Sequence, residues 1–270
     1  MKIFSHSLQG KRDSNEDQHI HIMNLSGENQ ELNPVTFIAV LDGHGGKAVS
    51  KYLKENLPPF FVNRFNKDIY SNSELSAKYF NKIYDLIQNK MKTDHPRAVQ
   101  YCGSTACVCI HIKDGKKDRL WVLNVGDSRA VKCNRSNIAE QLSQDHKPNS
   151  PSERLRIEQL GGKIEFDGSD WRIKDLSLSR AFGDIECTPY VTHLPQIYRN
   201  RIKNSDRFIV VACDGLWDVM SNQDAIDYIN ELQMNLKYKG NYAKDLAELA
   251  YQKGSLDNIT VVVYMLSNNS

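Results

Sequence analysis

Short apolar runs of strand length recur along the whole chain. The clearest are 37–41, 208–213 and 259–266, which are rich in β-branched residues and therefore predict buried strands. Polar and apolar residues alternate over 18–23, a pattern typical of a half-buried strand. Further strands are expected at 1–10, 103–112, 119–125 and 130–133. The pattern therefore predicts a protein built mainly on β-sheet.

The last three of these segments follow one another closely. Asp114-Gly115 is a hairpin signal between the first two strands, and Gly126 separates the second from the third. We therefore predict an antiparallel meander over 103–133.

Helical spacing of apolar residues separates the groups of strands. Helices are predicted over 44–65, interrupted at Pro58-Pro59, and over 74–92, 224–234 and 242–251. The apolar positions of the second helix, expected to pack on a sheet, are Leu75, Tyr79, Ile83, Leu86 and Ile87.

Residues 145–184 are richer in turn-forming residues than the rest of the chain. A short helix is predicted over 151–160, ended by Gly161-Gly162. We interpret 145–184 as a flap-like excursion from a single domain that spans 1–270.

Composition narrows the class of protein. The 270 residues are 40% hydrophobic and 25% charged, with a net charge of +2 and no concentrated basic block, so no nucleic-acid partner is expected. No apolar run approaches the roughly 18 to 20 residues of a membrane span, and the first residues lack the apolar core of a signal peptide. The six cysteines lie in apolar runs or alone, which predicts reduced thiols in a cytoplasmic or other intracellular reducing compartment. We also expect the protein to be a monomer.

Acidic residues share one position relative to the predicted strands. Asp42, Asp127 and Asp214 each follow a strand, while Glu16-Asp17 and Asp257 each precede one. In an antiparallel sheet the beginnings of some strands lie beside the ends of others, so these acids can meet at one rim. Their mutual repulsion would then need a divalent cation, and the all-oxygen ligand set favours Mg²⁺ or Mn²⁺ over Zn²⁺.

The segment Val40-Leu41-Asp42-Gly43-His44-Gly45-Gly46 carries the densest chemistry at this rim. It places a carboxylate, a flexible backbone carbonyl and an imidazole within three residues, with His44 at or just before a predicted helix start. Taken alone, most Asp-Gly pairs are ordinary turns, so the segment gains weight only from its partners.

The order of these pieces resembles the metal-dependent protein serine/threonine phosphatases of the protein phosphatase 2C type, over nearly the whole chain. The segments that carry the resemblance are residues 12–17, Asp42-Gly43-His44-Gly45-Gly46, Gly103-Ser104-Thr105-Ala106, Gly126-Asp127-Ser128-Arg129, Asp145-His146-Lys147-Pro148, Ser179-Arg180-Ala181-Phe182-Gly183-Asp184, Asp214-Gly215-Leu216-Trp217-Asp218 and Asp257-Asn258. The resemblance implies an α+β fold in which two antiparallel sheets stack as a β-sandwich flanked by α-helices.

The resemblance also implies roles for the acids at the rim. Asp42 would bridge two metal ions, and the other ligands would be Glu16, the Gly43 carbonyl, Asp214 and Asp257. Asp17 would orient metal-bound water, and Asp127 and Asp218 match positions that can hold a further, weaker metal.

Catalysis is implied by the same comparison. A water or hydroxide bridging the two ions would attack the phosphorus of a phosphoprotein substrate directly, without a phospho-enzyme. Arg12 would grip two phosphate oxygens with its planar guanidinium, and His44 would protonate the departing seryl or threonyl oxygen.

Simpler interpretations exist for several of these residues. Without the family order, Arg12 is a surface ion pair and Asp257-Asn258 a turn. Residues to which we assign only a supporting role in the fold are His146, Arg180, Asp184, Trp171 and Trp217. Lys174-Asp175 departs from the family pattern, near the flap.

Two other functions remain open at this point. A pseudophosphatase would be a binding module whose metal site has decayed, and retention of Arg12 and every metal acid argues against it. A hydrolase of small phosphate esters would keep the chemistry and change the substrate.

Overall fold

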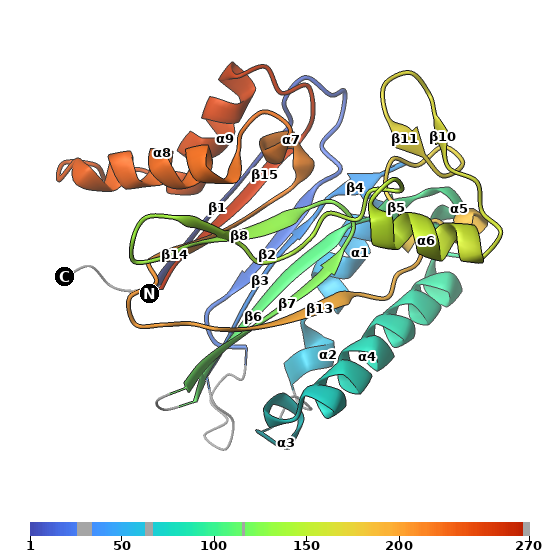
Figure 1. Cartoon of the computed structure of the whole chain (residues 1–270), viewed down its shortest axis with the longest axis horizontal. Coiled ribbons are helices and arrows are strands. Elements are labelled where there is room, and N and C mark those ends of the chain that lie inside the picture. The colour runs from blue at the N-terminus through green and yellow to red at the C-terminus, as the bar shows by residue number, and fades with distance from the viewer. Residues whose placement is uncertain (26–33, 63–66, 115–116, 267–270) are drawn as a thin grey trace.

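Two five-stranded antiparallel sheets form the centre of the molecule (Figure 1). The computed structural model describes residues 1–25, 34–62, 67–114 and 117–266. The first sheet has the order β1-β15-β14-β8-β9, and the second has the order β13-β7-β6-β3-β2. Their bounds are β1 Lys2–Leu8, β2 Gln18–Ile22, β3 Val35–Leu41, β6 Ala106–Asp114, β7 Lys117–Val125, β8 Arg129–Cys133, β9 Ala139–Gln141, β13 Gln196–Arg201, β14 Phe208–Ala212 and β15 Ile259–Met265.

Helices cover the outer face of each sheet. Helices α1 (Ala48–Asn56) and α4 (Ser73–Asp94) pack on the second sheet, and α8 (Asn222–Met234) and α9 (Tyr242–Gln252) pack on the first (Figure 1). The α+β sandwich expected from the sequence is therefore confirmed, with four layers.

The two sheets share an apolar interior. Side chains from both sheets meet there, among them Ile38 and Val122 from one and Val211 and Tyr264 from the other, all at most 1% exposed. Strand β3 is buried along its whole length because helices cover one face and the other sheet covers the second. This double burial explains why its sequence is a continuous apolar run.

The predicted meander over 103–133 is wrong in two respects. Strand β8 pairs with β14 in the other sheet, because the turn at Gly126, with φ of +97°, carries the chain across the sandwich. The first predicted strand is divided: β5 (Gly103–Ser104) pairs with β4 (Gly43–His44) and β12 (Phe182–Gly183) in a small sheet, and β6 continues in the large one. The β6 and β7 strands pair as predicted, but Gly115 lies outside the described residues.

Two helix predictions also need correction. His44 lies in β4, and α1 begins only at Ala48. A second short helix, α2 (Pro59–Val62), restarts after the break predicted at the prolines, and residues 63–66 lie outside the described part. On α4, Leu75 and Leu86 are exposed, because the buried face runs through Phe80, Tyr84 and Met91 instead.

The excursion at 145–184 has a small core of its own. Helix α6 (Pro151–Gln159) ends as predicted, with the Gly162 amide donating to the Ile157 carbonyl. This core consists of Ile157, Ile173, Leu178, Ala181 and Val191. The remaining elements, not predicted from the sequence, are α3 (Lys67–Ser71), α5 (Ala98–Tyr101), β10 (Glu165–Phe166), β11 (Trp171–Arg172), the 3₁₀ helix η1 (Ile185–Cys187) and α7 (Asp214–Trp217), besides β9 and β13.

Two further expectations concern the chain as a whole. All six cysteines are free thiols, and four of them are buried. Among the described residues, none of the helices has both the length and the apolar character that crossing a membrane requires.

Candidate metal centre

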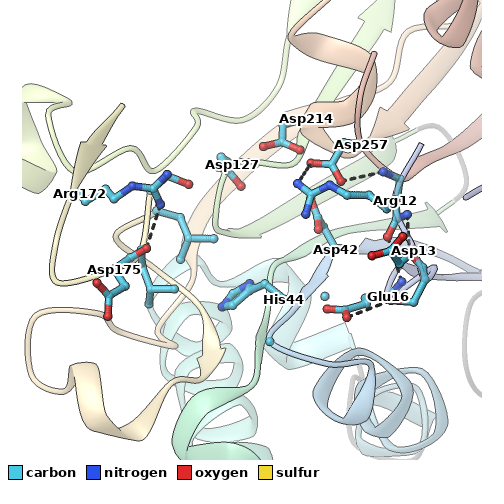
Figure 2. A pocket seen from close by; sticks show the side chains of 17 residues that line it. Arg12, Asp13, Glu16, Asp42, His44, Asp127, Arg172, Asp175, Asp214 and Asp257 are labelled. Atoms are coloured by element: carbon cyan, nitrogen blue, oxygen red, sulfur yellow. Dashed lines mark hydrogen bonds and ion pairs between the residues drawn. The ribbon is translucent and has the colours of Figure 1, made fainter. Parts of the chain in front are cut away.

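The acids gather at one rim of the sandwich, as the sequence predicts. Asp42, Asp127 and Asp214 follow β3, β7 and β14, while Glu16 and Asp257 precede β2 and β15. All five line one cavity of about 440 Å³, together with Arg12 and His44 (Figure 2). Strand ends from both sheets therefore build a single acidic cavity.

The acids lie close enough to share a cation. One carboxylate oxygen from each of Asp42, Asp127 and Asp214 lies within 4.8 Å of the others. Asp17, Asp42 and the Cys213 sulfur form a second such group, so Asp42 belongs to both. Hard carboxylate oxygens dominate the donor set, which suits Mg²⁺ or Mn²⁺ better than softer metals.

The pKa values of these carboxyl groups reflect their crowding. Burial, followed by the charges of Asp17 and Asp214, raises the pKa of Asp42 well above its usual range. Burial and the Asp127 charge do the same to the pKa of Asp214. Burial also raises the pKa of Asp17 to about 6 and raises that of Asp218. Since a divalent cation stabilises the charged forms, the site is arranged to accept one.

Asp17 gives a further sign that a cation fits here. Its side chain is 3% exposed, and neither carboxylate oxygen has a hydrogen-bond partner within the described part of the chain. An unpaired buried carboxylate is costly unless a cation or ordered water meets it. The residues present therefore fit a bound divalent metal.

Backbone contacts fix Asp42 in place. The Asp42 amide donates to the Thr105 hydroxyl oxygen at 3.0 Å, and the Thr105 amide donates to the Asp42 carbonyl at 2.8 Å. The Thr105 hydroxyl also contacts that of Ser128 at 2.8 Å. The Gly103-Ser104-Thr105-Ala106 segment thus holds the central acid.

Glu16 is held by hydrogen bonds with three other residues. Its carboxylate accepts from the Gly46 amide at 2.9 Å and from the Ser14 hydroxyl at 3.2 Å, and its own amide donates to the Asn258 side chain. A Cβ at Gly43 would lie 2.4 Å from the Glu16 carbonyl oxygen, so only glycine fits beside it. Glu16 and the Gly43 backbone are consequently packed together at the rim.

Arg12 reaches over the rim from the loop after β1. Its Nη2 donates to Asp257 Oδ2 at 2.7 Å, and its side chain is 61% exposed (Figure 2). The guanidinium therefore lies beside the acids while keeping donors accessible to an incoming anion.

His44 faces the cavity and is held from behind by Asp184. Its Nε2 lies 2.6 Å from Asp184 Oδ2, and Asp184 is 3% exposed. Burial by itself lowers the pKa of His44, but the hydrogen bond and charge of Asp184 outweigh it and raise that pKa above its usual value. A Cβ at Gly103 would lie only 2.1 Å from Asp184 Oδ2 and 2.3 Å from His44 Nε2. The pair exists because position 103 is glycine.

Lys147 supplies a positive charge inside the acidic cluster. Its Nζ lies 2.6 Å from Asp127 Oδ2 and 3.7 Å from Asp214 Oδ2. Burial opposes its charged form, but Asp127 and Asp214 together raise the pKa of Lys147 above its usual value. Asp127 thus has an ammonium partner within the protein.

Comparison with known proteins agrees with this geometry. Residues 1–259 match the model of the family described as Protein phosphatase 2C. The chain belongs to the protein phosphatase 2C family. Two Arabidopsis thaliana relatives are Probable protein phosphatase 2C 59, 39% identical, and Probable protein phosphatase 2C 11, 38% identical, each over 95% of this chain. The chain spans 77% of the first and 64% of the second.

A solved structure has a similar fold. The structure described as a C. elegans sex determining protein superimposes with a TM-score of 0.84 and 28% sequence identity. The match covers 98% of this chain and 65% of the other. Protein phosphatase 2C phosphatases are metal-dependent as a family, in accord with the clustered acids.

The protein phosphatase 2C fold does not bring all of the expected residues into the cavity. Asp218 is exposed at the end of α7 and is not part of the cavity wall, and Asp17 lies close to Asp42 without lining the cavity. Asp127 lies in the wall itself, beside Asp42 and Asp214.

Sequence reasoning missed several contributors to this protein phosphatase 2C site. Asp184 and Lys147 lie in motifs that we recognised, but we assigned Asp184 only a supporting role and did not assign Lys147 one. The flap contributes Arg172, which faces the cavity opposite Arg12 and donates to the Asp175 carbonyl at 2.9 Å (Figure 2). Asp184 and Lys147 could have been found because they lie in family motifs, whereas nothing in the sequence distinguished Arg172.

Proposed function

We propose that this protein hydrolyses phosphoserine and phosphothreonine in proteins with the help of two Mg²⁺ or Mn²⁺ ions. The observation that carries the proposal is the convergence of Asp42, Asp127 and Asp214 within 4.8 Å, in a cavity that also holds Arg12 and His44. In such a cavity the carboxylates can bind metal, the arginine can bind phosphate and the histidine can donate a proton.

The groups that would hold the two ions are the side chains of Glu16, Asp42, Asp214 and Asp257 and the Gly43 carbonyl. When bound, the ions activate water for attack on phosphorus and neutralise the charge of the phosphoryl group. We assign Asp17 the orientation of that water, and Asp127 and Asp218 a further, weaker ion.

Arg12 binds the phosphoryl group in this proposal. A planar guanidinium donates two parallel hydrogen bonds to phosphate oxygens, which an ammonium cannot do. In the absence of substrate Arg12 pairs with Asp257, and because this side chain is 61% exposed it can turn toward an anion in the cavity. The loss of one exposed ion pair is small against the gain of a bidentate phosphate contact.

His44 donates the proton to the departing oxygen. Asp184 engages Nε2, which leaves Nδ1 for the substrate, and the raised pKa favours the protonated imidazole that an acid requires. Alkoxide leaving groups need this proton far more than aryl oxides do.

We assign 1–270 to one catalytic domain that acts as a monomer on phosphoprotein substrates. Gel filtration with light scattering measures the mass, for which one chain of 30.9 kDa is expected.

The decisive experiment is hydrolysis of a phosphoserine peptide with Mn²⁺, with chelator, and after Asp42→Asn or Asp214→Asn. Chelator and either substitution are each expected to reduce turnover more than about 100-fold, since each removes metal from the cavity. Asp13→Asn is the matched control, because Asp13 lines the same cavity and is not an assigned ligand. Undiminished turnover in the Asp42 and Asp214 variants would defeat the proposal.

The substrate class is tested separately. Catalytic efficiency on the phosphopeptide is compared with that on small phosphate esters of similar leaving-group pKa. A higher catalytic efficiency on the small esters would show that the substrate is a small phosphate ester and not a phosphoprotein, while the proposed metal chemistry would stand.

A further inference from the structure

A second polar cavity lies at the far end of β7 from the acidic rim. It has a volume of about 400 Å³ and is lined by Ser71, Arg119, Arg199, Asn200 and Arg201. None of these lining residues carries a carboxylate. The cavity is therefore basic, in contrast to the acidic site.

Strand register places the three arginines on one face of the sheet. Strand β13 pairs with β7 so that Arg201 faces Arg119 and Arg199 faces Trp121. Residues directly opposite in an antiparallel pair project to the same side. Trp121 lies in the core beneath α4, so the arginines emerge on the helical side, at the edge strand.

Neighbouring groups hold two of the guanidinium groups in position. Arg199 Nη1 donates to the Ser73 hydroxyl at 2.5 Å, and its guanidinium lies 5.4 Å from the centre of the Trp121 ring. Arg119 Nη1 donates to the Tyr70 carbonyl and the Ser71 hydroxyl. These contacts orient the walls of the cavity before any ligand arrives.

Two of the three arginines in this cavity, Arg199 and Arg201, are not balanced by a carboxylate in the part of the chain that the structure describes. Among the described residues, neither Arg199 nor Arg201 forms an ion pair, and Arg201 is exposed without a hydrogen-bond partner. Arg199 contacts the hydroxyl of Ser73, which is neutral. Ser73 is the first residue of α4, and the N-terminus of this helix adds a partial positive charge. The guanidinium group of Arg199 is held in position and that of Arg201 is exposed. Together, two such groups in a small cavity suit a dianionic ligand better than a single carboxylate.

The position of the cavity suggests what carries the anion. Val125, the last residue of β7 before the acidic rim, comes six residues after Arg119, so the two sites are about 20 Å apart along the strand. An extended peptide covers at most about 3.5 Å per residue, and so needs at least about six residues to connect them.

We propose that this cavity, lined by Arg119, Arg199 and Arg201, docks a second phosphoserine or phosphothreonine of the same substrate chain. The inference rests on the proposed function, and it assigns the enzyme a preference for multiply phosphorylated segments. The second phosphoryl group is bound at the cavity and is not hydrolysed there.

The test uses peptides with one hydrolysable phosphoserine and a second position eight residues away. That position carries a non-hydrolysable phosphonate analogue of phosphoserine, a glutamate or an alanine. The phosphonate is expected to lower KM about tenfold relative to alanine with kcat unchanged, and glutamate to lower it less, because one charged contact contributes roughly that factor. Moving the phosphonate to two residues away should abolish the gain, since that spacing is too short.

Variants locate the effect. Arg201→Gln and Arg199→Gln should remove the phosphonate advantage while leaving hydrolysis of p-nitrophenyl phosphate unchanged. Lys203→Gln is the matched control, because Lys203 is an exposed cation outside the cavity wall. Equal KM values for the three peptides, or a phosphonate advantage that survives in Arg201→Gln, would overturn the proposal.

Direct binding separates this inference from the proposed hydrolysis. In chelator, a fluorescent peptide bearing only the phosphonate should bind the wild-type chain and the Lys203 variant, and bind the Arg201 variant about tenfold more weakly. Binding of this peptide by a protein that does not hydrolyse phosphoserine would support the docking site and contradict the proposed phosphatase activity. Hydrolysis without this binding would support the phosphatase activity and contradict the docking site.

Discussion

At the scale of single residues, the site depends on where charges are compensated. Asp184 balances His44, Asp257 balances Arg12, and Lys147 balances Asp127. Asp17 and Asp42 have no cationic side chain beside them among the described ion pairs. The uncompensated acids are therefore the ones that call most strongly for metal.

The leaving group tests the role of His44. His44→Ala should slow a phosphoserine peptide by about 100-fold or more and p-nitrophenyl phosphate by less than about tenfold, because only the alkoxide needs the proton. Steady-state kcat on the two substrates measures the difference. Equal losses on both would remove His44 from the acid role.

Asp184→Asn tests the support behind His44. Removing the carboxylate charge should lower the pKa of His44, so the basic limb of the kcat profile on the peptide should move to lower pH. The same profile on p-nitrophenyl phosphate serves as the control. A peptide profile that stays in place would show that Asp184 does not tune His44.

Lys147 competes with metal for Asp127 and Asp214 in this arrangement. Lys147→Met should destabilise the metal-free protein by about 3 kcal/mol, since it leaves a buried carboxylate unpaired, and should enlarge the rise in Tm produced by Mn²⁺. Thermal unfolding with Mn²⁺ and with chelator measures both. The exposed Lys237→Met is the control, and an unchanged or smaller Mn²⁺ effect in the Lys147 variant would contradict the competition.

At the scale of elements, three very short strands position the proton donor. In the small sheet, Gly103 of β5 faces His44 of β4 on one side and Gly183 of β12 on the other. The turn that precedes η1 places Asp184, with φ of +46°, against the same glycine. Segments distant along the chain thus meet at one backbone position that lacks a side chain.

Gly103→Ala should therefore separate His44 from Asp184 without altering any charge. We expect the same selective loss on the phosphoserine peptide as in His44→Ala, with most activity on p-nitrophenyl phosphate retained. Circular dichroism and urea unfolding check that the sandwich remains folded. If the variant hydrolyses the peptide at the wild-type rate, the close approach is not needed for catalysis.

At the scale of the whole molecule, the flap-like excursion is joined to the sandwich through a buried imidazole. His146 accepts from the Gly126 amide, donates to Gln196, and its carbonyl accepts from the Ser179 amide. Burial, followed by the charge of Arg180, lowers the pKa of His146 to about 4. The folded protein therefore keeps this imidazole neutral.

That neutral imidazole makes stability depend on pH. Between about pH 6.5 and 4 the unfolded chain binds a proton at His146 that the folded chain does not, so the free energy of unfolding should fall by about 3 kcal/mol as pH decreases through this range. Urea unfolding at several pH values measures the slope. His146→Asn keeps an acceptor for the Gly126 amide but cannot titrate, so its slope should be shallower, and an equal slope would assign the effect to other groups.

Patterns that are local in the chain were readable from the sequence. Runs such as 208–213 and 259–266 were predicted as buried strands and form β14 and β15, and the helix at 151–160 carried its own stop signal in Gly161-Gly162. The acids predicted to share one rim do so, because each lies directly beside a strand end and strand polarity then places it.

Contacts between distant segments were decided only by the tertiary structure. Strand β8 does not continue the predicted meander, because the turn at Gly126 carries the chain to the other sheet, where β8 pairs with β14. The Asp184 contact with His44, the Lys147 contact with Asp127 and the basic cavity at Arg201 each join segments that no local pattern relates. The sequence by itself determined where most of the long strands and helices form and which strand ends carry the acids of the site, since these follow from periodicity and from neighbours along the chain. Only the packing decided which charged side chains pair with one another, because these partners depend on how the sheets and helices meet in space.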